Sequence, residues 1–229
     1  MAIVKKYPAE VVSVINSIDG IYTVEFRSLD KPFKFDPGQF MHLALEAYDP
    51  TGQWPDSRCF SMQSSPADEF IKITFAVKGS FTKRMETYLQ PNAEVTLKLP
   101  YGDLFTQPHS KSNNVFIAGG TGITPFLSLF THTSFGLYDK PLLFAGFRNQ
   151  QMNLYAKELS KAKEINPSLE WQAVYEDTDG RLNIEDILNQ CGAESTFFIS
   201  GPPIMIKSFK EFLLHTGVNQ NNVLTDDWE

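Results

Sequence analysis

A cluster of glycines within residues 119–122 is the stretch whose residue types point most directly to binding chemistry. Residues 115–125 read V-F-I-A-G-G-T-G-I-T-P, so an apolar run meets three glycines before Thr124-Pro125 opens an amphipathic segment. That order is typical of a strand, a tight turn and a helix. Glycine lets the backbone approach a phosphate closely, and the free N–H groups at a helix start favour an anion. The stretch predicts a phosphate-binding turn, although such turns also carry glycine for structural reasons alone.

A second group of chemically useful side chains is Arg58-Cys59-Phe60-Ser61. On a strand, Arg58 and Phe60 point to the same face. A guanidinium matches phosphate oxygens, and a flat ring can stack on a flat heterocycle. The alternative is an arginine on a barrel rim beside a core phenylalanine.

A third candidate is the turn Lys78-Gly79-Ser80-Phe81-Thr82, which leads into a helix expected over residues 81–89. Its exposed N–H groups and the hydroxyls of Ser80 and Thr82 could hold a second phosphate. Alternatively, Ser80 is simply an N-cap, worth about 1 kcal/mol.

Composition excludes several function classes. The 229-residue chain has a net charge of -7 and neither half is basic, so a nucleic-acid partner is not expected. Two cysteines provide neither a disulfide framework nor the four thiolates of an iron–sulfur cluster, and four scattered histidines predict no metal site. No apolar run approaches the roughly 20 residues of a membrane span, and the N-terminus lacks a signal-peptide core. We therefore expect a cytoplasmic protein without a membrane span.

The first half predicts a small antiparallel β-barrel. Residues 10–27 alternate apolar and polar side chains around a turn at 16–20, as a β-hairpin does. Further short strands are expected at 40–45, 58–63, 70–77 and 94–99. Many short strands with one brief helix are typical of a barrel.

The second half predicts a parallel sheet with helices on both faces. After a polar linker at 107–114, apolar runs alternate with helical patterns, among them a helix expected over 153–165, through residue 225. The expected organisation is therefore β plus α/β, with domains at 1–108 and 109–229. Ligands of such sheets bind at the carboxyl ends of the strands. The glycine turn, Arg148, residues 176–181 and residues 200–202 all fall there.

Motifs spread over nearly the whole chain carry a family resemblance. They are Phe35-x-Pro37-Gly38-Gln39-Phe40, Arg58-x-Phe60-Ser61-x-x-Ser64-Ser65-Pro66, Gly79-x-x-Thr82, Pro100-x-Gly102, residues 115–125, and Ser200-Gly201-Pro202-Pro203-x-Met205. In this order they resemble the ferredoxin-NADP+ reductase family, with a flavin barrel followed by an NAD(P)H-binding domain.

The resemblance implies a flavin site in the first domain, holding FAD, with FMN possible. Arg58 would bind the flavin pyrophosphate, Phe60 would stack on the isoalloxazine, and Ser61 would hydrogen-bond the flavin near N5. The family usually has tyrosine where this chain has Phe60, so stacking is retained and a phenolic hydrogen bond is not. The other residues expected at this site are Cys59, Phe75, Val77, Lys78, Gly79, Ser80, Phe81 and Thr82.

The resemblance also implies a pyridine-nucleotide site in the second domain. The residues expected there are Gly120, Thr121, Gly122, Thr124, Pro125, Arg148, Glu176, Asp177, Gly201 and Pro202. Ser200 stands where the family usually has cysteine and would lie against the nicotinamide. The ending T-D-D-W-E resembles an acidic-x-aromatic terminus, with Asp226 near flavin N5 and Trp228 beside the ring. Ser61, Ser200 and Asp226 are thus the expected catalytic residues.

Charge at residues 176–181 bears on the choice of nucleotide. Glu176-Asp177 stand where NADP-dependent relatives often have serine and arginine. Two carboxylates within about 5 Å of a 2′-phosphate would each cost on the order of 1 to 3 kcal/mol, which favours NADH over NADPH. Arg148 and Arg181 keep NADPH possible, and a solvated acidic loop is the alternative interpretation.

The resemblance implies an oxidoreductase that moves a hydride from NAD(P)H to flavin N5, in the cleft between the two domains, and passes electrons singly to an acceptor. Because no C-x-x-x-x-C-x-x-C run occurs, we expect a separate acceptor: a ferredoxin, a cytochrome, an oxygenase component or a small molecule. The alternatives are a free-flavin or ferric reductase and a non-catalytic nucleotide-binding electron-transfer subunit. Sequence does not indicate the oligomeric state.

Overall fold

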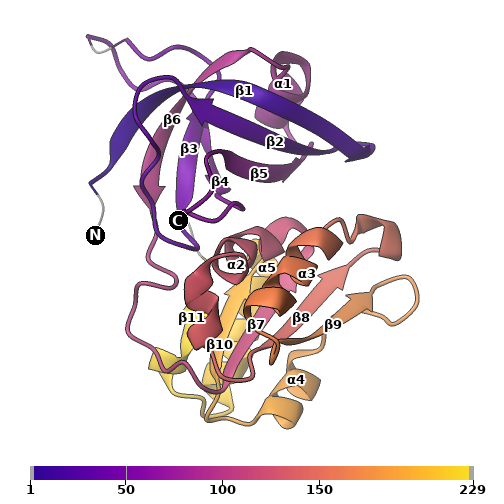
Figure 1. Ribbon diagram of the computed structural model, residues 1–229. Coiled ribbons are helices and arrows are strands. Elements are labelled where there is room, and N and C mark those ends of the chain that lie inside the picture. Colours follow the sequence, from indigo (N-terminus) through magenta and orange to yellow (C-terminus); the bar gives the residue numbers. More distant parts are fainter. Residues whose placement is uncertain (1–2, 50, 227–229) are drawn as a thin grey trace. The chain divides into compact units, whose positions relative to one another are not determined.

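The structure is a computed structural model that describes residues 3–49 and 51–226. The chain divides into two compact units, Met1–Asp103 and Leu104–Glu229 (Figure 1). The division falls a few residues before the expected 108/109 boundary. Leu104 and Phe105 pack into the core of the second unit, where the Phe105 and Phe198 ring centres lie 5.2 Å apart.

The first unit is a six-stranded antiparallel sheet that curls into a nearly closed barrel. Its elements are β1 (Lys5–Ile18), β2 (Ile21–Ser28), β3 (Phe40–Ala44), β4 (Ser57–Ser61), β5 (Ile71–Ala76), α1 (Ser80–Tyr88) and β6 (Glu94–Tyr101). The strand order is β4-β3-β6-β1-β2-β5. Just beyond β4, the Gln63 backbone N–H donates to the Lys72 carbonyl at 2.8 Å, which draws the two edge strands together.

Alternation along the strands fills the barrel. Inward side chains such as Tyr7, Ala9 and Val11 on β1 are buried, and the residues between them, Pro8 and Glu10, are more exposed. Helix α1 adds Phe81 and Met85 to the same core. The start of α1 is thereby fixed to the barrel that also carries β4.

The second unit is a five-stranded parallel sheet between two helical layers. Its elements are β7 (Asn114–Gly119), η1 (Gly120–Ile123), α2 (Thr124–Phe130), η2 (Thr133–Leu137), β8 (Leu142–Phe147), η3 (Gln150–Met152), α3 (Ala156–Ile165), β9 (Glu170–Tyr175), α4 (Ile184–Cys191), β10 (Thr196–Ser200), α5 (Pro203–His215), η4 (Gln220–Asn222) and β11 (Val223–Thr225). The order is β11-β10-β7-β8-β9. Helices α2 and α3 pack on one face and α4 and α5 on the other.

This strand order creates a topological switch point at β7. After β7 the chain continues to β8 and β9 on one side, and then returns to β10 and β11 on the other. Crevices at the carboxyl ends of strands on either side of such a point are where open α/β sheets bind ligands. The carboxyl ends of β7 and β10 are therefore where this unit is expected to bind a ligand.

The predicted fold class, a barrel followed by a parallel-sheet domain, is confirmed. Two local details differ from the expectations. The turn after β7 continues as the 3₁₀ turn η1 instead of a simple tight turn. The helix expected over 153–165 begins at Ala156, because Asn149 Oδ1 accepts from the Met152 N–H at 3.2 Å and caps the separate turn η3.

Candidate functional sites

Strand β4 presents different chemistry on its two faces. Arg58 is exposed, whereas Phe60 is half-buried and packs against the barrel core. Cys59 turns to His42 on β3, with its Sγ 3.7 Å from His42 Nε2, and burial raises the pKa of the thiol. Any contact between Cys59 and a ligand on the Arg58 face would therefore come from its backbone. Ser61 ends the strand as a buried residue.

The Phe60 ring belongs to a short aromatic series. Its centre lies 6.2 Å from that of Phe75 at an edge-on angle of 64°, and Phe75 stacks on Tyr22 at 5.5 Å. Phe75 and Phe81 are themselves core residues, 3% and 4% exposed. Of the three phenylalanines expected at the flavin, Phe60 is the one with ring surface left to offer a ligand.

At the start of α1, the Thr82 hydroxyl shapes the loop. Its Oγ1 accepts from the backbone N–H groups of Lys78 at 2.9 Å and Gly79 at 3.0 Å, and it donates to the Gly79 carbonyl at 3.1 Å. The alternative of Ser80 as N-cap is wrong, since Gly79 holds that position and Ser80 is the first helical residue. Thr82 therefore holds the turn, and Ser80 is an exposed residue at its helical end.

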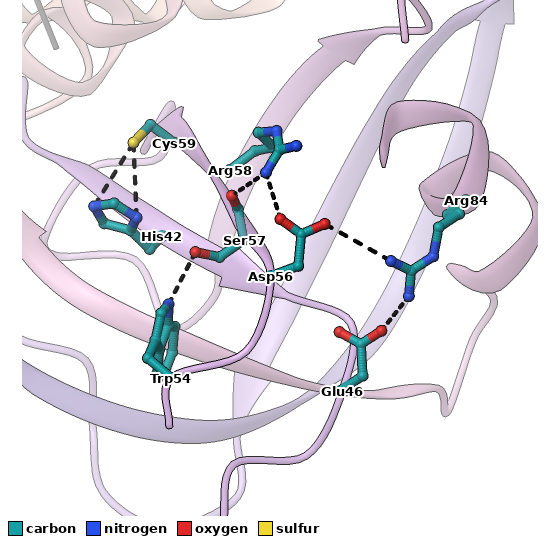
Figure 2. A network of polar contacts seen from close by, with 8 residues as sticks. All are labelled: His42, Glu46, Trp54, Asp56, Ser57, Arg58, Cys59 and Arg84. Carbon is teal, nitrogen blue, oxygen red and sulfur yellow. Dashed lines mark hydrogen bonds and ion pairs between the residues drawn. The ribbon is translucent and has the colours of Figure 1, made fainter. Parts of the chain in front are cut away.

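Arg58 is held by an anion. Its Nη1 donates to Asp56 Oδ1 at 2.6 Å and to the Ser57 carbonyl at 2.7 Å. The guanidinium lies 5.0 Å from the centre of the Phe81 ring, which belongs to the first turn of α1. Figure 2 shows this pair within a longer chain of ionic contacts. An arginine that donates to a carboxylate beside the start of a helix has the charge and the geometry to donate to a phosphate as well.

In the second unit, glycines let two loops touch at the switch point. A Cβ on Gly122 would lie 2.4 Å from Gly201 Cα and 2.6 Å from the Ser200 carbonyl oxygen. A Cβ on Gly119 would lie 2.8 Å from Pro202 Cδ. Gly120, with φ +55, makes no such close approach and instead turns the chain. Glycine at 119 and 122 therefore lets the turns of residues 119–122 and 200–202 pack together, and we call these two packed turns the glycine cradle.

Ser200 and Asp226, two expected catalytic residues, meet beside this cradle. The Ser200 hydroxyl donates to Asp226 Oδ2 at 3.1 Å, and the Asp226 N–H donates to the Ile199 carbonyl at 3.0 Å. Ser200 is 3% exposed.

Pro125 occupies the first turn of α2, and the Thr124 hydroxyl donates to the Thr121 carbonyl at 2.9 Å. Trp228 lies outside the described residues.

The expected acidic loop lies at the carboxyl ends of β8 and β9. The N–H groups of Glu176 and Asp177 donate to the carbonyls of Phe147 and Arg148, at 2.8 and 3.1 Å. Arg181 Nε donates to Glu176 Oε1 at 2.8 Å, and all of these charged side chains are exposed. Of the two arginines that could favour a 2′-phosphate, Arg181 is thus already paired with a carboxylate.

Two residues beside Arg58, Asp56 and Arg84, were not among the candidate site residues found from the sequence. Arg84 and Asp56 extend the contacts of Arg58, as described below, and the only sequence signal was the spacing D-x-R at 56–58. Within residues 3–49 and 51–226, no group of three or more His, Cys, Asp or Glu side chains could hold a metal ion. No helix in the described part of the chain is long and apolar enough to cross a bilayer.

Comparison with known proteins identifies the family. A model of an FAD-binding domain matches residues 5–136, more than half of the chain, and a model of an oxidoreductase NAD-binding domain matches residues 116–211. The chain belongs to the ferredoxin-NADP+ reductase-like family. The expected resemblance is thereby confirmed, as is the pairing of FAD- and NAD(P)-binding domains.

Individual relatives agree with this assignment. The chain is 26% identical over 213 residues to the ferredoxin–NAD(P)+ reductase component of the naphthalene 1,2-dioxygenase system of Pseudomonas putida, covering 86% of this chain and 62% of the relative. It is 31% identical over 156 residues to methane monooxygenase component C of Methylosinus trichosporium, covering 66% and 44%. The chain spans about half the length of the curated relatives it matches.

A solved structure shows the same fold. The ferredoxin NADP+ reductase from Neisseria gonorrhoeae with bound FAD and NADP has a TM-score of 0.79 and 19% identity, covering 96% of this chain and 97% of its own. Both units are therefore represented in a single known architecture.

Proposed function

We propose that this chain is an FAD-dependent NADH reductase that passes electrons to a separate one-electron acceptor. The observation that carries the proposal is the glycine cradle at the switch point, beside the Ser200–Asp226 hydrogen bond, in a chain whose other unit is an FAD-binding domain. A Cβ on Gly122 would meet backbone atoms 2.4 to 2.6 Å away, so this packing requires glycine. At the neighbouring Gly120 a Cβ would meet no atom within 4 Å, so the backbone of this turn is open to the approach of a pyrophosphate.

The residues of the barrel unit fit a flavin. Arg58 offers its guanidinium to the diphosphate in place of Asp56, and the N–H groups at the start of α1 add partial positive charge. Phe60 offers a ring surface for stacking, and Ser61 a buried hydroxyl at the end of the same strand. These side chains bind and orient the cofactor.

The residues of the second unit position the donor. The Ser200 hydroxyl donates to the Asp226 carboxylate, which fixes both groups beside the cradle. Because Asp226 Oδ2 accepts from the Ser200 hydroxyl, the carboxylate orients that hydroxyl. When bound, flavin supplies acceptance of a hydride and release of single electrons, and nicotinamide supplies the hydride. The protein's contribution is positioning and exclusion of water.

NADH is favoured as the donor. Residues 176–181 hold three carboxylates, Glu176, Asp177 and Asp179, against Arg181, which Glu176 already binds. A 2′-phosphate would add negative charge to this loop, whereas a ribose diol would not. We place the proposed reaction in the cytoplasm, as expected from the sequence.

The names of the relatives support an oxygenase component or a ferredoxin as the electron acceptor. One is the reductase component of a dioxygenase system and another is a component of methane monooxygenase. The acceptor would be tested by supplying a reconstituted ferredoxin and a ferric cytochrome in parallel and comparing their rates of reduction.

An anaerobic absorbance titration tests the proposal. The protein purified with FAD is titrated with NADH and, separately, with NADPH, while the flavin band near ~450 nm is followed. Stoichiometric bleaching by NADH and little by NADPH is expected. Bound flavin that neither nucleotide bleaches would refute the reductase and favour a non-catalytic subunit. Flavin that passes through an ultrafiltration membrane after reduction would favour a free-flavin reductase.

A further inference from the structure

Two arginines of the barrel unit share one carboxylate (Figure 2). Asp56 Oδ1 lies 2.6 Å from Arg58 Nη1, and Asp56 Oδ2 lies 3.9 Å from Arg84 Nη1. Both guanidiniums also lie over the Phe81 ring, with their Cζ atoms 5.0 and 5.9 Å from its centre. The Asp56 carboxylate thus lies between two guanidinium groups, Arg58 from β4 and Arg84 from α1.

The two nitrogens at the end of Arg84 have different partners. Its Nη2 is paired with Glu46, which follows β3, and its Nη1 faces Asp56. Glu46 therefore orients the guanidinium without occupying the nitrogen that faces Asp56. Asp56 is 56% exposed and belongs to the loop that enters β4, so its carboxylate can be replaced by another anion.

We propose that Arg84 is a second diphosphate-binding arginine and that Asp56 is a built-in competing anion, displaced when FAD binds. The proposal rests on the proposed function, since it takes FAD as the ligand of this unit. A diphosphate carries adjacent anionic groups that two neighbouring guanidiniums can each bind through charge-assisted hydrogen bonds. Arg58 takes the phosphate nearer the flavin, and Arg84 takes the phosphate that bears adenosine.

A surface hollow beside Arg84 can receive the adenosine. It has a volume of about 460 Å³ and is lined by Leu45, Glu46, Ala47, Arg84, Thr87 and Tyr88. The Tyr88 ring is 45% exposed, and its hydroxyl donates to the Glu94 carbonyl at 2.9 Å, which fixes one end of the ring. A flat, anchored aromatic surface suits an adenine base. Because FMN lacks both the second phosphate and the adenosine, this half of the site selects FAD.

The experiment compares three flavins on the protein stripped of cofactor. Dissociation constants for riboflavin, FMN and FAD are measured by the quenching of flavin fluorescence. Arg84→Gln is expected to weaken FAD about tenfold and FMN less than twofold, whereas Arg58→Gln weakens both. Asp56→Asn is expected to tighten FAD about threefold, because the competing charge is gone while the side-chain volume is kept.

Arg27→Gln is the matched control. Arg27 is an exposed arginine on β2 that pairs with Glu10 on β1, so its loss removes a similar surface ion pair and is expected to leave all three constants unchanged. Thermal melting of each stripped variant checks that the fold is retained. A merely structural network predicts that Asp56→Asn lowers the melting temperature and weakens FAD.

The outcomes separate the inference from the proposed function. Equal effects of Arg84→Gln on FMN and FAD, no effect on either, or weaker FAD binding by Asp56→Asn would overturn the inference. If the wild-type chain binds FAD and NADH reduces it, the proposed function stands whatever the variants show. If bound FAD is not reduced by NADH, the reductase proposal fails, and the binding constants still decide the roles of Arg84 and Asp56. A wild-type chain that binds none of the flavins would refute both.

Discussion

Replacing Gly122 by alanine tests the contact between the two switch-point loops. The added Cβ would lie 2.4 Å from Gly201 Cα, 2.5 Å from Gly201 N and 2.6 Å from the Ser200 carbonyl oxygen. Ordinary contacts of a Cβ begin at 3.4 Å, and all three atoms are backbone, so the loops after β7 and β10 must separate by about 1 Å. We expect a loss of about 3 kcal/mol in the free energy of unfolding.

The functional effect follows from the same displacement. A misplacement of about 1 Å at a reacting site can cost on the order of a hundredfold in rate. Gly122→Ala is therefore expected to slow anaerobic reduction of bound FAD by NADH about 100-fold in stopped-flow measurements. The affinity for FAD should stay unchanged, because the residues proposed to hold it belong to the other unit. The melting temperature should fall by roughly 6 to 12 °C.

Gly120→Ala is the control within the same turn. Gly120 has φ +55, and a Cβ there would meet no atom within 4 Å. The substitution strains the backbone by about 1 to 2 kcal/mol without pushing the two loops apart. It should therefore destabilise the protein while slowing reduction much less. If Gly122→Ala reduces FAD within threefold of the wild-type rate, the switch-point contact does not position the donor and the reasoning is wrong.

Four further predictions test other parts of the structure. Ser200→Ala removes the hydrogen bond to Asp226 and should slow hydride transfer about tenfold without changing FAD affinity. If the variant reduces FAD at the wild-type rate, with normal NADH and with deuterated NADH alike, the prediction is contradicted. Asp177→Arg should raise the kcat/KM for NADPH relative to NADH at least tenfold, and a constant ratio would remove the acidic loop from nucleotide choice. Asn114 is 1% exposed, and neither Oδ1 nor Nδ2 has a hydrogen-bond partner in the described part of the chain, so Asn114→Val should stabilise the protein by about 1 kcal/mol in denaturant unfolding. Burial lowers the pKa of His109 below its ordinary 6.5, so the unfolded chain takes up a proton more readily; stability should hold above pH 6.5 and fall as the pH drops from 6.5 toward the lowered pKa, and His109→Gln should flatten that decline in thermal melts.

Much of the architecture could be predicted because its determinants are local. The alternation on either side of residues 16–20 predicts a hairpin, and the succession of apolar runs and amphipathic segments after residue 114 predicts a parallel sheet. The residues around Arg58 and the glycine turn are also found locally, since each motif lies on one strand or one turn.

Contacts between distant segments could not be predicted. Glu46 and Arg84 are 38 positions apart and meet because β3 and α1 belong to the same barrel. Gly122 and Gly201 come together only because β7 and β10 pair in parallel. The pattern of residues 79–82 indicated a helix start but not that the Thr82 hydroxyl would turn back to bind the loop. Each of these depends on tertiary pairing or on a rotamer, which residue spacing does not encode.

The same kind of ion pair has opposite consequences in the two units because the surrounding charge differs. In the barrel unit, Arg58 and Arg84 balance Asp56 and Glu46, and the start of α1 adds positive potential, so a diphosphate that displaces Asp56 meets two cations. Residues 176–181 hold three carboxylates and one arginine, and Arg148 on the neighbouring loop still leaves the carboxylates in the majority. A phosphate that displaced Glu176 from Arg181 would enter a loop that still holds Asp177 and Asp179. Arginine count alone therefore does not predict phosphate binding; the local balance of charge left after displacement does.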